Sequence, residues 1–263
     1  MLKIKNLIKV FYPGTVNETK AINGIDLHIE KGDVVSLIGS NGSGKSTLFN
    51  LISGTFPVTS GQIILDGSDV TNMSEYKRAM LIGRVFQDPT KGTSPTMSIE
   101  DNLIVSSKKG MRGLNFSLYK KGAREQFNSM LDKIGLGGRL KDNVGLLSGG
   151  QRQALTLLMT MQSNPKLLLL DEHTAALDPQ AADRIMQMTE DIIKTHSLTC
   201  MMITHNMQFA IGFGNRLIMM NGGKVILDVK GEEKKSLTVP KLISFFKSRG
   251  GEEFSDDAAL LTD

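Results

Sequence analysis

The feature that most constrains this chain is a glycine-rich loop between an apolar segment and an expected helix. The apolar segment covers residues 34–38, and residues 39–47 read Gly-Ser-Asn-Gly-Ser-Gly-Lys-Ser-Thr. They match the phosphate-binding pattern G-x-x-x-x-G-K-[ST] at every defined position. Backbone N–H groups must come within about 3 Å of phosphate oxygens, and glycines permit that approach. The stretch therefore predicts a strand, a nucleotide-binding loop and a helix.

The loop residues have expected roles toward a nucleotide. The helix that begins near Lys45 points its positive end at the phosphates, and Lys45 adds a full charge near the β- and γ-phosphates. Ser46 offers a hydroxyl to Mg²⁺. The expected nucleotide contacts are Gly39, Ser40, Asn41, Gly42, Ser43, Gly44, Lys45, Ser46 and Thr47. The alternative is a turn that only joins a strand to a helix, but the agreement of strand, loop, Lys-Ser pair and helix favours binding.

Composition narrows the class of protein. A length of 263 residues with 40% hydrophobic residues allows one large or two small domains with a sizeable core. The net charge of +4 does not by itself point to nucleic acid, and the basic clusters at 108–112, 120–124 and 234–235 lack interleaved aromatic residues. Cys200 is the single cysteine, which fits a reducing compartment. We find no signal peptide and no membrane-spanning stretch, so we expect any membrane role to need a partner.

Strand-like and helix-like segments alternate after the loop. Strands are expected at 2–10, 21–30, 62–65, 81–86, 167–170, 199–204, 216–220 and 224–229. Helices are expected at 99–105, 117–134, 149–162, 179–194 and 206–213. This order predicts an α/β fold with a mainly parallel sheet and helices on both faces. The change of composition between 88 and 146 predicts a helical insert.

Two carboxylates end the apolar run at 167–170. A strand end beside a phosphate loop is where an α/β sheet keeps its chemistry. We expect Asp171 to hold Mg²⁺, through water, and Glu172 to polarise the attacking water. The alternative is a buried strand that ends in surface charges.

Residues 147–151, Leu-Ser-Gly-Gly-Gln, form a second anion-receptive segment. Ser148 can contact a γ-phosphate, followed by the N–H groups of Gly149 and Gly150 and by Gln151. One nucleotide does not need two such sites in one chain, so we expect the two segments to face each other across a two-fold dimer. The alternative is an ordinary helix N-cap.

The order of these motifs resembles the ATP-binding cassette (ABC) family of transport ATPases, over roughly residues 1–230. The resemblance implies a head-to-tail homodimer with two ATP molecules, each between the loop of one subunit and the Leu-Ser-Gly-Gly-Gln segment of the other. It also implies that Gln87 senses Mg²⁺ and γ-phosphate and that His205 contacts the γ-phosphate. Asp178 matches the loop that crosses the dimer. Phe11, or in second place Tyr12, matches the aromatic residue that stacks on adenine.

The same resemblance implies an architecture and partners. A RecA-like core at 1–87 and 163–240, with an N-terminal antiparallel β subdomain, carries a helical subdomain at about 88–162. Residues 241–263 form a C-terminal helix and tail. The implied partners are ATP, Mg²⁺, a second copy and a membrane permease, with an extracytoplasmic binding protein acting indirectly and no nucleic acid. The implied location is the cytoplasmic face of the membrane. The surface at 88–102 is expected to receive the permease's cytoplasmic helix.

The sequence departs from the family at one place. After Asp171 and Glu172 the family usually has Pro-Thr-Ser, whereas this chain has His173, Thr174 and Ala175. We interpret His173 as a packing residue rather than as part of the dimer interface. Since Glu172 and both halves of the site are intact, two competent sites are expected in a homodimer.

Stretches at 11–18, 82–89 and 170–178 resemble a bacterial importer group often assigned to aromatic amino acids such as tryptophan or tyrosine. Three alternatives remain. An exporter or lipoprotein-release ATPase would share these motifs. A soluble ABC protein acting on nucleic acid or the ribosome is disfavoured, because such proteins carry two cassettes or a long coiled coil. A non-hydrolysing switch is disfavoured by Glu172 and His205.

Overall fold

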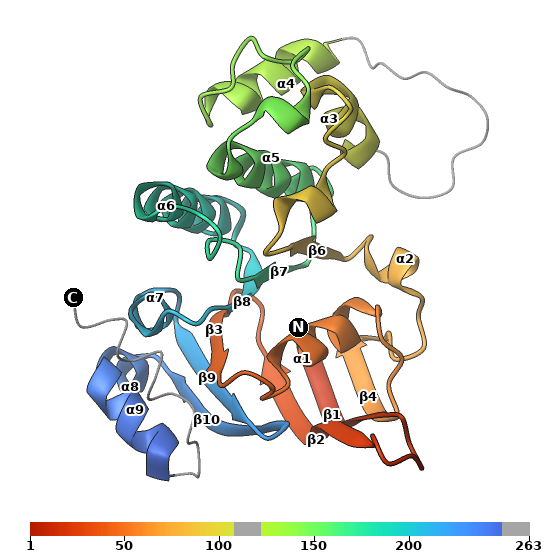
Figure 1. The fold of residues 1–263 in the computed structure, drawn as a ribbon, viewed down its shortest axis with the longest axis vertical. Helices are drawn as coiled ribbons and strands as arrows, with labels where there is room; N and C mark the ends of the chain where they lie inside the picture. The colour runs from red at the N-terminus through yellow and green to blue at the C-terminus, as the bar shows by residue number, and fades with distance from the viewer. Residues whose placement is uncertain (108–121, 249–263) are drawn as a thin grey trace. The chain divides into compact units, whose positions relative to one another are not determined.

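The computed structural model describes residues 1–107 and 122–248. The chain divides into two compact units, which we describe separately: unit 1 is 1–78 with 197–263, and unit 2 is 79–196. Figure 1 shows the course of the chain. Some predictions fall outside the described residues. They are the start of the helix expected at 117–134, the basic residues at 108–112 and 120–121, and the tail from 249.

Unit 1 contains an antiparallel sheet whose strand order is β2-β1-β4-β5. Its strands are β1 (Leu2–Phe11), β2 (Thr19–Ile29), β4 (Ser60–Leu65) and β5 (Ser68–Asp69). The central strand β1 pairs with β2 and β4, so that Leu2 lies opposite both Ile29 and Leu65. Because alternate residues point to one face, these side chains form a continuous buried layer.

The second sheet of unit 1 has the order β10-β9-β3-β8. Its strands are β3 (Val34–Gly39), β8 (Thr199–Ile203), β9 (Arg216–Asn221) and β10 (Lys224–Lys230). The strand β3 is parallel to β8 and β9, and β10 is antiparallel to β9. The strands β3 and β8 are mostly apolar and are buried along almost their whole length, as expected for strands covered on both faces. The glycine-rich loop follows β3 at its carboxyl end, which is the reactive edge of such a sheet.

The described part of unit 1 also contains helices. They are α1 (Lys45–Ser53), α2 (Glu75–Arg78), α7 (Met207–Gly212), α8 (Glu232–Lys235) and α9 (Val239–Ser248). The buried Arg78 donates to the carbonyls of Leu51 and Ile52, near the end of α1, at 2.6 and 2.9 Å. The last carbonyls of a helix lack intrahelical partners, so this guanidinium anchors α1 behind the loop.

Unit 2 contains the parallel strand pair β6 (Ile82–Val85) and β7 (Leu167–Asp171) and a group of helices. The helices are η1 (Pro89–Gly92), α3 (Ile99–Ser107), α4 (Ala123–Asp132), η2 (Val144–Leu146), α5 (Gly149–Met161) and α6 (Pro179–His196). One apolar core joins α3, α4 and α5 through side chains such as Leu103, Phe127 and Leu155. Buried Glu100 of α3 also binds Arg124 of α4 and Lys141, which lies between α4 and η2.

The predicted α/β fold, with an antiparallel β part and a mainly parallel sheet, is confirmed. Helix α5 ends one residue before the predicted position and α6 runs two residues longer, while β1 and β2 differ by a residue or two at their ends. The predicted subdomain boundaries at 88–162 and 163–240 remain a prediction. Among the described residues, none of the helices combines the length and apolar character needed to cross a bilayer.

Candidate nucleotide-binding site

The loop between β3 and α1 has a backbone that only glycine allows at two points. Gly39 has φ +153°, and a Cβ there would lie 2.3 Å from the carbonyl oxygen of Met220. Gly44 has φ +102°, and a Cβ there would lie 2.6 Å from the carbonyl oxygen of Ala21. The loop is therefore pressed against neighbouring backbone. Gly44 is also the N-cap of α1 and offers no side-chain cap to the helix N–H groups.

Two side chains of the loop complete an anion site. The buried Lys45 donates from Nζ to the carbonyl oxygens of Gly39 and Ser40, both at 2.8 Å, so its ammonium lies over the loop. The Ser43 hydroxyl is buried and has no hydrogen-bond partner. A buried hydroxyl without a partner costs free energy unless a ligand satisfies it. This orphan hydroxyl, the glycines and Lys45 fit a phosphate, while Ser46 presents its hydroxyl at an exposed position.

The remaining predicted residues of unit 1 lie at element ends. His205 is half-buried between β8 and α7, where Asn206 caps α7 through a bond from the Phe209 N–H. Phe11, at the end of β1, has an edge-on ring contact with Phe56 at 5.4 Å and the Lys9 ammonium at 4.9 Å from its centroid. Tyr12 is 68% exposed. The Tyr12 ring is therefore the more accessible of the two aromatic candidates.

In unit 2, the two predicted carboxylates end β7. Asp171 is mostly buried and binds Arg84 of β6, with 2.9 Å between Oδ2 and Nη2. Glu172 is half-buried and has a left-handed backbone, with φ +48°. Such a conformation is uncommon for a residue with a Cβ, and it turns the chain sharply just after the strand.

Gln87 follows β6 and is exposed. The residues on both sides of it are fixed. The carbonyl of Phe86 accepts a hydrogen bond from Nε2 of buried Gln153 on α5, at 3.1 Å. Asp88 accepts hydrogen bonds from the Thr90 N–H and hydroxyl, which start η1 and lower the pKa of Asp88.

The segment 147–151 forms a helix start in which both polar side chains are engaged. Ser148 accepts a bond from the Gln151 N–H, and the Gln151 side chain accepts one from the Ser148 N–H, which makes a capping box. A Cβ on Gly149 would lie 3.3 Å from Leu177, and one on Gly150 would lie 3.2 Å from Ala181. The N-cap interpretation is therefore correct as local structure, and the glycines keep the start of α5 close to residues 177–181.

A cleft of about 610 Å³ lies beside this helix start. Its lining includes Ser148, Gln151 and Asp178 from the predicted site, together with Lys133 and Arg184. Asp178 accepts a bond from the Ala181 N–H at 3.0 Å and so caps α6. Unit 2 thus brings the Leu-Ser-Gly-Gly-Gln segment and Asp178 together at one cationic cleft.

His173 is buried and packs on α6. Its Nε2 lies 3.2 Å from the Thr189 hydroxyl, which itself donates to the Ile185 carbonyl at 2.7 Å. Because that hydroxyl has one proton, His173 must donate from Nε2, and its buried Nδ1 is left without a partner. Burial lowers the pKa of His173 to about 4. The predicted packing role fits this placement.

The residues predicted for magnesium offer hard oxygen donors. Ser46 contributes a hydroxyl, Gln87 an amide oxygen and Asp171 a carboxylate, which is the donor chemistry that Mg²⁺ prefers when water and phosphate supply the other ligands. Groups of three or more His, Cys, Asp or Glu side chains suited to a metal are absent from the described part of the chain. The donor types of the three predicted residues therefore fit magnesium.

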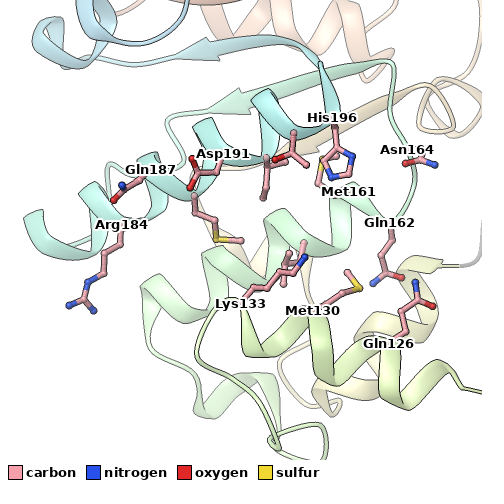
Figure 2. Close-up of a pocket in the computed structure, with 14 residues that line it drawn as sticks. Gln126, Met130, Lys133, Met161, Gln162, Asn164, Arg184, Gln187, Asp191 and His196 are labelled. Atoms are coloured by element: carbon pink, nitrogen blue, oxygen red, sulfur yellow. The ribbon is translucent and has the colours of Figure 1, made fainter.

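Figure 2 shows a second cleft in unit 2, of about 730 Å³, between α4, α5 and α6. It shares Lys133, Arg184 and Met188 with the cleft beside the helix start. None of the predicted site residues lines it.

Sequence reasoning did not single out Arg84 or Gln153. Both lie in or beside motifs that it did identify, but their partners are 87 and 67 residues away along the chain. The only signal was a charged residue in the middle of an otherwise apolar strand, which indicates a buried partner without identifying it.

Comparison with known proteins gives consistent matches. The family profile described as ABC transporter matches residues 22–175. The chain is 45% identical to a tyrosine transport ATP-binding protein of Clostridioides difficile, over 94% of this chain and 99% of that protein. It is 32% identical to a methionine import ATP-binding protein of Corynebacterium glutamicum, over 86% of this chain, and spans only 61% of that longer protein.

Solved structures with the same fold include ATP-binding cassettes. One is a dimeric cassette in a post-hydrolysis state bound to ADP and Pi, with 27% identity and a TM-score of 0.72 over 88% of this chain and 98% of that one. Another is a nucleotide-free cassette from an ABC transporter, with 26% identity and a TM-score of 0.77 over 94% of this chain and 98% of that one.

Proposed function

This chain belongs to the ABC transporter family as an ATP-binding subunit with ATPase activity, and we propose that it energises import of an aromatic amino acid through a separate membrane permease. The observation that carries the proposal is the phosphate loop with its unpartnered Ser43 hydroxyl, in a chain 45% identical to a tyrosine transport ATP-binding protein. Tyrosine is the first substrate to test and tryptophan the second.

The proposed reaction is hydrolysis of the β–γ phosphoanhydride bond. Lys45, the loop N–H groups and Ser43 bind the phosphates. Glu172 accepts a proton from the attacking water while the oxygen of that water bonds to the γ-phosphorus. His205 orients the γ-phosphate. When bound, magnesium neutralises charge on the β- and γ-oxygens, and Ser46, Gln87 and Asp171 would hold it. Tyr12 or Phe11 stacks on the adenine.

We further propose that two copies act as a dimer at the cytoplasmic face of the membrane. Ser148, Gly149 and Gly150 of one copy contact the γ-phosphate bound by the other. Asp178 lines the same cleft as Ser148 and Gly150. The dimeric cassette bound to ADP and Pi supports this arrangement. Closure on ATP and opening after phosphate release would drive the permease, with an extracytoplasmic binding protein delivering the amino acid.

Dimerisation is tested with purified Glu172→Gln, which keeps the shape of the side chain but cannot accept the proton. Light scattering should show a monomer-to-dimer shift on addition of MgATP, and the added substitution Ser148→Arg should abolish it. ATP binding without a dimer, even with the permease present in membranes, would contradict the composite site.

Substrate is tested by uptake of labelled tyrosine into cells that carry this subunit with the permease encoded beside it. Uptake should require Glu172 and be competed by unlabelled tyrosine. Competition by methionine or putrescine but not by aromatic amino acids would refute the substrate proposal.

The permease contact is tested at 88–102, the surface that begins with η1 and reaches α3. A cysteine placed there should form a crosslink with a cytoplasmic loop of the permease. Reversal of an exposed charge, such as Lys91→Glu, should reduce transport while basal ATPase activity persists. Unchanged transport would count against this surface.

A further inference from the structure

We propose, on the basis of the function proposed above, that Arg84 is a positioning residue that competes with magnesium for Asp171 and so sets how much magnesium the site needs. Such a residue does not contact the reacting atoms itself. It acts through the carboxylate that it holds.

Strand register brings the two residues together. In the parallel pair β6–β7, Arg84 is aligned with Leu169, two residues before Asp171. Alternate residues of a strand point to one face, so Arg84 and Asp171 share a face at the end of β7. Their side chains are 12% and 16% exposed, and Nη2 lies 2.9 Å from Oδ2. This ion pair is thus largely shielded from water.

The guanidinium has a second contact that fixes its position. Its central carbon lies 4.7 Å from the centroid of the Phe86 ring. The Phe86 backbone is itself held by Gln153 of α5, through the bond to its carbonyl. Arg84 therefore lies between an aromatic ring and the carboxylate, and this arrangement restricts the freedom that a long side chain would otherwise retain.

The charge of Arg84 and the lone pairs of Asp171 decide whether Arg84 strengthens or weakens magnesium binding. The guanidinium of Arg84 brings a positive charge to Oδ2 of Asp171, 2.9 Å away. A cation at this distance repels a second cation and occupies an acceptor site that a magnesium-bound water would use. A merely structural Arg84 would have the opposite effect, because its removal would disorder Asp171 and weaken metal binding.

The experiment measures binding rather than turnover. In the Glu172→Gln protein, magnesium chloride is titrated against a fluorescent ATP analogue, and the midpoint of the magnesium-dependent rise in affinity is recorded. Arg84→Met keeps the stem beside Phe86 and removes the charge. We expect its midpoint to fall about three- to tenfold, the range for a partly buried ion pair. Arg84→Lys keeps the charge but not the planar group that stacks on Phe86, so its midpoint should fall less than that of Arg84→Met.

Asp171→Asn is the control that tests whether Arg84 acts on magnesium binding through the Asp171 carboxylate. In that background Arg84→Met should shift the midpoint by less than about twofold, because the carboxylate through which it acts is absent. Melting in EDTA checks that each variant is folded, and Arg84→Gln replaces Arg84→Met if the latter is not. An unchanged or raised midpoint in the folded variant overturns the inference. A parent protein that binds the nucleotide with no magnesium dependence overturns this inference and the proposed metal site together.

Discussion

The predicted site residues of unit 1 and those of unit 2 differ in how they are held before any ligand binds. In unit 1, the phosphate loop keeps Ser43 without a partner, and α1 begins without a side-chain cap. In unit 2, Ser148 is engaged in a capping box, Asp178 caps α6, and Asp171 binds Arg84. The Ser43 hydroxyl of unit 1 therefore has no internal bond to give up, although Lys45 does donate to two carbonyls of the loop. Under the proposed function, the polar side chains of unit 2 would exchange internal bonds for bonds to the nucleotide. Such exchange is what allows ligand binding to be coupled to a conformational change.

The largest expected effect is a loss of nucleotide affinity, which should occur when a site residue of unit 1 is changed but not when one of unit 2 is. Lys45→Met should weaken binding of an ATP analogue by about 100-fold, because charge-assisted bonds to phosphate are lost. Ser148→Ala should leave the affinity of the monomer within about twofold of wild type. Equilibrium fluorescence titration at protein concentrations below dimerisation measures both. A similar loss in the two variants would remove the distinction between a preorganised site and a switchable one.

A pair of glycines tests the origin of this preorganisation. Gly39→Ala should lower the free energy of unfolding by about 3 kcal/mol, because its Cβ would meet the Met220 carbonyl at 2.3 Å. Gly42 is the matched control in the same loop, since it also has a positive φ but no atom within 4 Å of its Cβ. Gly42→Ala should cost about 1 kcal/mol. Equal losses in urea unfolding would show that backbone conformation, not close packing, limits the loop.

The buried histidine of unit 2 predicts a pH dependence. Burial places the folded pKa of His173 at about 4, below its ordinary value of 6.5, so the unfolded chain takes up a proton first as pH falls. The stabilisation is complete above pH 6.5 and is lost as pH falls toward 4, and the loss amounts to about 2 kcal/mol by pH 5. Urea unfolding of His173→Leu should lack this part of the loss between pH 7 and pH 5. The exposed His28→Gln is the control and should follow wild type.

The smallest expected effect compares two helix caps. Ser148 caps α5 in unit 2 and Asn206 caps α7 in unit 1, each through a bond to a backbone N–H. Replacement of either by alanine should cost about 1 kcal/mol in the free energy of unfolding. Only Ser148→Ala should also impair ATP-dependent dimerisation in the Glu172→Gln background. If Asn206→Ala impairs dimerisation equally, the effect of Ser148 is one of stability rather than of ligand contact.

Much of the fold was predictable because its signals are local. The strand, glycine loop and helix at 34–53 follow from an apolar run, residues without a Cβ and a Lys-Ser pair, all adjacent in the sequence. The alternation of strands and helices indicated the parallel sheet. Helix and strand ends were less accurate, since capping and fraying there depend on a few competing hydrogen bonds.

The sequence by itself determined the chemistry of the candidate site: a phosphate loop, oxygen donors for magnesium, a strand-end carboxylate and a second glycine-rich helix start. Only the tertiary structure decided which partners these groups have and how deeply they are buried. It placed Arg84 on Asp171 through the register of β6 and β7, left Ser43 without a partner, and buried His173 against Thr189. The physical reason is that motifs are set by neighbours in the chain, whereas charge pairing and burial depend on residues that the fold brings together from far apart.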